Sequence, residues 1–184
     1  MSIRSKAAIS FLVLMAISCQ LPTALLGAEP ADAKKPFTVV LLPDTQNYAE
    51  KYPDTYIAQT LWIRKQFKED NIKFAIHLGD IVQTSTKKNE WENANRAMQI
   101  LDGVVPYSMV PGNHDMVVKE RNSTLYNQFF SPKRFQDRKW YGGHLGDNND
   151  NNYCFFEGGG LKFLVISLEF APRDETLKWA AGIC

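Results

Sequence analysis

Short apolar runs recur through the first part of the chain, and each ends at a polar cluster. Residues 37–42, 73–78 and 104–110 are rich in apolar and β-branched side chains. Runs of this length, bounded by turn-forming residues, predict strands, and we expect the first of them to be buried on both faces. The residues that follow them contain glycine, proline, aspartate and asparagine, which favour turns.

Helical periodicity separates these predicted strands. After Pro53, the positions that face one way repeat at steps of three and four residues: Ile57, Leu61, Arg64 and Phe67. We expect a second helix to begin at Asn89 as its cap, with Glu92 completing a capping box. Its apolar stripe is Trp91, Ala94, Met98 and Leu101.

The repeated order of strand, loop and helix predicts the fold class. It is typical of an α/β protein with a largely parallel sheet. In such a sheet the loops at the carboxyl ends of the strands face one side, where ligands bind.

The pattern becomes less regular after Asp115. We expect a short helix within residues 122–130 and a long loop over 131–152, which is rich in Gly, Asn and Asp. Residues 153–157 and 161–168 flank three consecutive glycines and predict a β-hairpin. Pro172 is expected to begin a final helix.

The first 28 residues have the layout of a secretory signal. Arg4 and Lys6 precede an apolar run over residues 7–17, and small residues continue to Ala28. The apolar run is shorter than the roughly 20 residues that span a bilayer. We therefore expect a signal peptide at 1–28, a linker at 29–36, export to the periplasm or the extracellular space, and no transmembrane segment in the mature chain.

The three cysteines allow alternatives. Cys19 follows small and apolar residues within the leader and is a candidate for lipid attachment. Export would permit a disulfide between Cys154 and Cys184. Cys154 also stands between aromatic residues, where a free thiol would serve as a small core side chain.

Composition and charge indicate which kinds of binding partner the chain can have. The chain has 184 residues, of which 45% are hydrophobic, enough for one globular domain with a buried core. Of its 21 basic residues, Arg4 and Lys6 lie in the leader, and 20 residues are acidic. A nearly neutral mature chain implies no nucleic-acid binding.

The candidate chemistry lies immediately after the three predicted strands. The clusters there are Asp44-Thr45-Gln46, Gly79-Asp80 and Gly112-Asn113-His114-Asp115. Carboxylate, amide and imidazole groups are ligands of divalent cations. Each cluster alone also fits an ordinary loop or cap, but together and in this order they predict a metal site.

These clusters resemble the signature of the calcineurin-like metallophosphoesterase superfamily over residues 37–184. That signature runs Asp-x-His, Gly-Asp, Gly-Asn-His-Asp/Glu, a His, and Gly-His-x-His. The opening Pro43-Asp44-Thr45-Gln46 looks like a bacterial branch in which Gln replaces the first His. The resemblance implies an αββα sandwich with parallel βαβ units followed by an antiparallel hairpin.

The resemblance also implies a function and a set of residue roles. It implies a phosphoester substrate, which a hydroxide shared by two metal ions attacks at phosphorus. Asp44 and Gln46 would bind the first metal, Asp80 would bridge both, and Asn113 would bind the second. His114 would stabilise or protonate the leaving oxygen, and Asp115 would orient its ring.

The metals remain open between Mn, Fe, Zn, Mg and Ca. Gln46 places an amide where the family has an imidazole, which favours Mn, Mg or Ca. The family's last three histidines have no counterpart, because His77, His114 and His144 are the only histidines here. The alternative is therefore a catalytically inactive fragment, truncated at the C-terminal end of the domain.

Other polar and aromatic residues are weighed against ordinary roles. His77 lies within a predicted strand and is expected to be packed rather than a ligand. His144 either reaches the substrate or is solvated. Residues 147–152 are expected to form a solvated loop rather than a calcium site. The aromatic residues at 129–130 and 153–156 are expected in the core.

Overall fold

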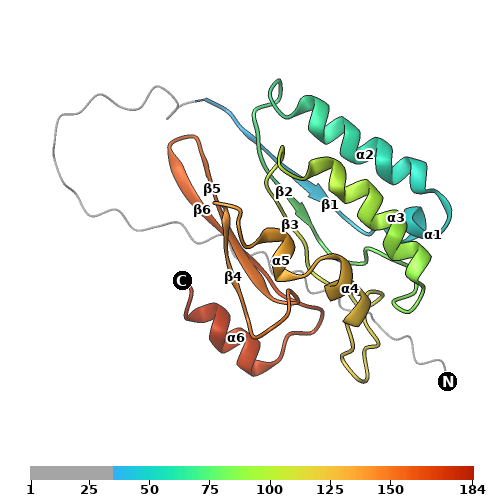
Figure 1. Cartoon of the computed structure of the whole chain (residues 1–184). Coiled ribbons are helices and arrows are strands. Elements are labelled where there is room, and N and C mark those ends of the chain that lie inside the picture. The colour runs from blue at the N-terminus through green and yellow to red at the C-terminus, as the bar shows by residue number, and fades with distance from the viewer. Residues whose placement is uncertain (1–34) are drawn as a thin grey trace, which may run out of the picture.

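Two three-stranded sheets pack face to face, with helices outside them, in a computed structural model that describes residues 35–184 (Figure 1). The predicted signal peptide, and the linker up to residue 34, lie outside the described residues. Within residues 35–184, no helix combines the length and the apolar character needed to cross a membrane.

The first sheet is parallel and carries the candidate site. Its strand order is β1 (Thr38–Leu42), β2 (Ile72–His77) and β3 (Tyr107–Ser108). β2 lies in the centre, paired with both neighbours. It is buried on both faces. β1, for which this was predicted, instead leaves Leu41 exposed.

Helices cover one face of this sheet (Figure 1). They are α1 (Gln46–Lys51), α2 (Pro53–Gln66), α3 (Lys88–Met98) and the 3-10 turn Gln99–Leu101. Their buried side chains include Tyr56, Ile63, Trp91 and Met98. The start of α2 at Pro53 is confirmed, whereas α1 was not predicted.

The predicted capping box of α3 is wrong. The helix begins at Lys88, one residue before Asn89, and its cap Lys87 makes no side-chain hydrogen bond. The carboxylate of Glu90, in the first turn, instead accepts hydrogen bonds from the preceding loop. Glu90 therefore satisfies backbone amides of that loop, not those of the helix N-terminus.

The second sheet is antiparallel. Its order is β4 (Tyr141–His144), β5 (Asn152–Gly158) and β6 (Leu161–Ser167). The predicted hairpin is confirmed as β5 and β6. Its turn uses positive φ at Gly159 (58°) and Gly160 (80°), which glycine adopts without steric cost.

An aromatic and aliphatic layer joins the two sheets. Phe74 and Ile76 of β2 pack against Cys154 and Phe156 of β5. The rings of Phe74 and Phe156 stack with centroids 5.4 Å apart. Helix α6 (Asp174–Ala181) covers the outer face of the second sheet through Trp179. The layers are thus αββα, consistent with the expected fold, although α6 begins two residues after Pro172.

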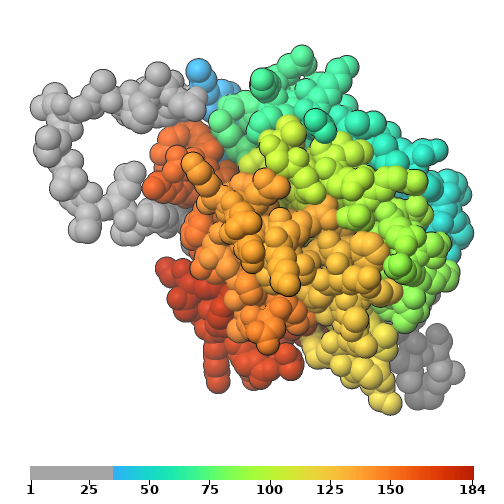
Figure 2. Space-filling model, in the orientation of Figure 1, coloured from blue at the N-terminus to red at the C-terminus, as the bar shows by residue number. Residues whose placement is uncertain are grey.

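The segment predicted as a loop over 131–152 contains regular structure. After α4 (Thr124–Phe129), α5 (Pro132–Phe135) and β4 occupy part of it. In Figure 2 this yellow-to-orange segment lies directly against the green region of α3. β4 has little strand propensity, but the ring of Tyr153 packs directly on Gly142. A Cβ built on Gly142 would lie only 2.2 Å from the Cε2 atom of Tyr153. Tertiary packing therefore defines this strand.

The third strand is shorter than residues 104–110. The amides of Val104 and Val105 both bond back to the Leu101 carbonyl, as in a helical turn. At the other end, the Met109 carbonyl accepts hydrogen bonds from the side chains of Tyr126 and Asn152. Only Tyr107–Ser108 remains in the ladder with β2.

Residues 149–152 are buried, so the prediction of a solvated loop is wrong for them. Asn149 donates its side-chain amide to the Phe130 carbonyl at 2.9 Å, and Asn152 donates to the Met109 carbonyl at 2.8 Å. These bonds compensate for burial of the polar groups. Cys154 is a buried free thiol and Cys184 an exposed one, so the permitted disulfide is absent.

Candidate metal centre

Three loops leave the carboxyl ends of the parallel strands and meet at one edge of the first sheet. They carry Asp44–Gln46 after β1, Gly79–Gln83 after β2 and Gly112–Asp115 after β3. In parallel α/β sheets this edge is where ligands bind. The contacts that join the loops decide whether the candidate side chains are held together.

His77 and Thr45 join the first loop to the second. The amide of Gly79 donates to Nδ1 of the His77 ring at 3.2 Å, so Nε2 carries the hydrogen. Nε2 lies 2.9 Å from Thr45 Oγ1, and the Thr45 hydroxyl donates to the Ile81 carbonyl at 3.1 Å. Both side chains are buried, and burial lowers the pKa of His77 to about 3. The interpretation of His77 as a packed side chain is confirmed.

Asp115 joins the second loop to the third. Its Oδ1 accepts hydrogen bonds from the amides of Ile81 and Val82, both at 2.9 Å. Its Oδ2 accepts from the amides of Gly112 at 2.8 Å and Ile81 at 3.0 Å. Burial raises the pKa of this carboxyl to about 7, against the lowering effect of the three amides. One carboxylate thus satisfies three backbone donors that would otherwise be buried without partners.

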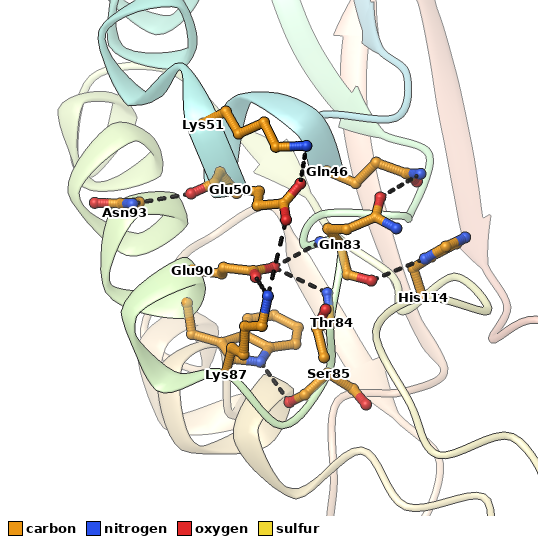
Figure 3. Close-up of polar contacts among 12 residues, drawn as sticks. Gln46, Glu50, Lys51, Gln83, Thr84, Ser85, Lys87, Glu90, Asn93 and His114 are labelled. Atoms are coloured by element: carbon orange, nitrogen blue, oxygen red, sulfur yellow. Dashed lines mark hydrogen bonds and ion pairs between the residues drawn. The ribbon is translucent and has the colours of Figure 1, made fainter.

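The His114 ring is oriented by Gln83 rather than by Asp115. Nδ1 of His114 lies 2.9 Å from the Gln83 carbonyl, to which it donates (Figure 3). Both oxygens of Asp115 accept hydrogen bonds from backbone amides. The expected contact between Asp115 and the His114 ring is therefore not formed, and the Gln83 carbonyl takes its place. The backbone amide of His114 donates to Asp80 Oδ1 at 3.0 Å. The ring nitrogen Nε2 makes no hydrogen bond with residues 35–184.

Two of the candidate ligands have unusual backbone conformations. Asp44 has a φ of 27° and Asp80 a φ of 48°, a region that side-chain-bearing residues rarely adopt. Such conformations persist where surrounding contacts hold them, and they cluster at functional sites. Gly79, at a φ of 97°, and Gly112 allow the second and third loops to approach closely.

The structure joins one pair of the predicted residues by a direct bond, from the His114 amide to Asp80. Gln46 bonds instead to Gln83, which was not predicted. Asp44 precedes the buried Thr45 and is exposed, as is Asn113. His144 lies at the end of β4, stacked on Tyr141 with centroids 6.1 Å apart. Within residues 35–184, its side chain makes no hydrogen bond to the three loops.

The donor chemistry at this edge fits a hard divalent cation. Residues 35–184 contain no cluster of three or more His, Cys, Asp or Glu side chains placed to hold a metal ion. The candidates are two carboxylates, Asp44 and Asp80, and two amides, Gln46 and Asn113. Oxygen donors of this kind suit Mg, Mn or Ca rather than softer metals.

Sequence reasoning missed Gln83 and Glu90, which brace the site. Glu90 is fully buried, and its Oε2 accepts the amides of Gln83 and Thr84, both at 2.9 Å (Figure 3). Its Oε1 pairs with Lys87 at 3.2 Å. The position of Gln83 three residues after Asp80 gave no signal, because its contacts depend on residues more than 30 positions away.

Comparison with known proteins agrees with the fold and the loops. A model of the calcineurin-like phosphoesterase family matches residues 37–180. The chain therefore belongs to the calcineurin-like phosphoesterase family. It is similar to a relative from Bacillus subtilis (strain 168), "Uncharacterized protein YvnB", at 36% identity over 148 residues. That alignment covers 80% of this chain and 11% of the relative, so the chain spans about a tenth of the relative's length.

Proposed function

We propose that this chain hydrolyses phosphoesters with two divalent metal ions at the edge formed by the loops after β1, β2 and β3. One observation carries the proposal. Through His77, Thr45 and Asp115, buried hydrogen bonds tie the three loops together. The loop bearing Asp80 thereby lies between the loops that bear Gln46 and Asn113.

The proposed ligand set follows from this order of loops. Asp44 and Gln46 would hold one ion, Asn113 would hold the other, and Asp80 would serve both. When bound, two such ions activate a water molecule as the nucleophile and neutralise charge on the phosphoryl oxygens. The oxygen donors favour manganese, magnesium or calcium over zinc.

His114 is the proposed proton donor to the leaving oxygen. Its Nδ1 donates to the Gln83 carbonyl at 2.9 Å, so Nε2 is the nitrogen that takes up or delivers a proton. Asp115 acts as a positioning residue, since it holds the amides of Gly112 and Ile81 on either side of the site. His144, at the end of β4, remains a weaker candidate for contact with the substrate.

Export is a second part of the proposal. The leader-like pattern of residues 1–28 supports delivery to the periplasm or the extracellular space, with Cys19 as an alternative lipid-attachment point. The substrate is proposed as a phosphoester only.

A second candidate is that the domain has the frame of the family but does not turn over substrate. The observation in its favour is that residues 35–184 hold no cluster of three or more His, Cys, Asp or Glu side chains that could bind a metal. In that case the chain would bind the metal only weakly, with a dissociation constant in the millimolar range.

Calorimetric titration of the full chain with Mn²⁺, together with hydrolysis of a chromogenic aryl phosphodiester, tests both candidates. We expect Asp80→Asn to reduce the rate by roughly 100-fold or more, because ligand changes exceed the 10- to 100-fold losses typical of supporting residues. Asparagine tolerates the positive φ of Asp80 and can still accept the His114 amide. The variant should therefore remain folded.

Asp54→Asn is the matched control, since Asp54 is an exposed residue on α2. Hydrolysis by Asp80→Asn at the wild-type rate would contradict the two-metal proposal. Millimolar or absent Mn²⁺ binding by the wild-type chain, with no turnover, would support the inactive alternative.

A further inference from the structure

A single peptide group lies between a buried carboxylate and the ring of His114. The amide of Thr84 donates to Glu90 Oε2 at 2.9 Å. The carbonyl of Gln83 accepts from His114 Nδ1, also at 2.9 Å (Figure 3). That amide and that carbonyl belong to one peptide bond, the bond between Gln83 and Thr84. Glu90 and His114 therefore hold the two ends of one planar unit.

The planarity of this unit couples its two contacts. The bond between Gln83 and Thr84 is trans, so its N–H and its C=O point in opposite directions. While Glu90 holds the N–H, the carbonyl is directed away from Glu90 and towards the His114 ring. A rotation of the peptide plane by half a turn would break both hydrogen bonds at once. The contact with Glu90 thus fixes the direction of the acceptor that His114 meets.

Glu90 is itself held in place, in the first turn of α3. Its side chain is fully buried, and Oε2 also accepts the Gln83 amide at 2.9 Å. Its other oxygen pairs at 3.2 Å with Lys87, whose side chain is half-exposed. Every acceptor in this series is a carboxylate or carbonyl oxygen, and such oxygens cannot donate. The direction of each hydrogen bond is therefore fixed, with the two amides and Nδ1 of His114 as the donors.

We propose that Glu90 is a positioning residue for His114, which acts through the Gln83–Thr84 peptide group to orient the ring and to keep the hydrogen of the neutral ring on Nδ1. Its effect on the reaction rests on the proposed function. A carboxylate bonded to the N–H also polarises the peptide group, which makes the carbonyl a stronger acceptor. Nε2 is then the nitrogen that exchanges a proton with the leaving oxygen. The support expected from Asp115 comes instead from a carboxylate on α3.

Nitrogen-15 NMR of the His114 ring in the metal-free full chain tests the inference, because it reports which ring nitrogen carries the hydrogen. Glu90→Leu removes both acceptors at similar size, and Glu90→Asp withdraws the carboxylate by one methylene if the leucine variant does not fold. Glu90→Gln keeps an oxygen that can accept both amides. Lys87→Ala is the matched control, since it removes the ion pair of Glu90 and leaves both amide bonds.

We expect the hydrogen of the neutral His114 ring on Nδ1 in the wild type, in Glu90→Gln and in Lys87→Ala. In Glu90→Leu and Glu90→Asp it should be shared between the two nitrogens, because the peptide group is free to turn. Hydrolysis of the aryl phosphodiester by these two variants should slow by roughly 10-fold, a part of the ~10²- to 10⁴-fold contribution of general acid–base catalysis. In a His114→Ala background, Glu90→Leu should cause little further loss.

Three outcomes would overturn the inference. The first is a wild-type ring with its hydrogen on Nε2. The second is a folded Glu90→Leu or Glu90→Asp variant, verified by thermal unfolding, that keeps the hydrogen on Nδ1 and the wild-type rate. The third is an equal loss of rate with and without His114, which would show that Glu90 acts on the fold as a whole. A wild-type chain with the hydrogen on Nδ1 but without turnover would instead contradict the proposed function and support the orientation of His114 by Glu90.

Discussion

Gly112 lies so close to Asp80 that a Cβ built on Gly112 would stand 2.1 Å from Asp80 Oδ1 and 2.4 Å from the Asp80 nitrogen. Real side chains do not tolerate such contacts, and the obstructing atoms include backbone. The glycine is therefore what allows the loop after β3 to approach the loop after β2. The same approach allows the His114 amide to reach Asp80 Oδ1.

Gly112→Ala should for this reason destabilise the protein by about 1–3 kcal/mol, the usual effect of an added methyl group in a tightly packed position. Urea denaturation measures the change. Gly182→Ala is the control, because a Cβ there would meet its nearest atom, the Trp179 carbonyl oxygen, at 3.4 Å. Equal stability of the two variants would contradict the claimed close approach.

Asp115→Asn should cost about 2–4 kcal/mol, because the new NH₂ group would face backbone amides that now donate to a carboxylate. The amides concerned belong to Gly112, Ile81 and Val82. Urea denaturation, with the exposed Asp147→Asn as control, measures this loss. A variant within about 0.5 kcal/mol of wild type would show that Asp115 does not hold the loops together.

His77 should make the fold sensitive to acid. Burial lowers its pKa to about 3 from 6.5, so the unfolded chain binds the extra proton first. The stabilisation from the neutral ring is complete above pH 6.5 and falls as the pH drops towards 3. From pH 7 to pH 5 this loss amounts to about 2 kcal/mol.

The measurement is the difference in unfolding free energy between wild type and His77→Gln at pH 7 and at pH 5. Asp115, whose pKa is raised to about 7, contributes stability that is lost as pH rises, which is the opposite direction. That contribution is present in both proteins and largely cancels in the difference. A difference independent of pH would mean that His77 is not kept neutral in the fold.

Local patterns were sufficient to predict elements whose stability is local. The start of α2 follows from Pro53, whose fixed φ suits the first helical turn. The hairpin of β5 and β6 follows from two runs of residues that flank glycines able to accept a positive φ. The order of the three loops at the sheet edge also followed from the alternation of strands and helices.

Features that depend on distant partners were not predictable. β4 is defined by the packing of the Tyr153 ring against Gly142. The side chain of Asn149 can be buried because it donates a hydrogen bond to the Phe130 carbonyl. In the candidate site, the residue types were visible but their partners were not. Asp115 was expected to contact a ring and instead accepts backbone amides, while Gln83 takes up the ring of His114.

The carboxamide of Asn152 joins the second sheet to the first. It donates to the Met109 carbonyl at 2.8 Å and to the Asn149 carbonyl at 3.1 Å, next to the end of β3. Apolar contacts such as that between Phe74 and Phe156 are not directional, so they alone set the alignment of the two sheets only weakly. A shift of one residue between the sheets would take the Met109 carbonyl away from this buried amide, at about 1–3 kcal/mol, although that carbonyl would keep the Tyr126 hydroxyl as a donor. Asn152 thus favours the native alignment of the two sheets over one shifted by a residue.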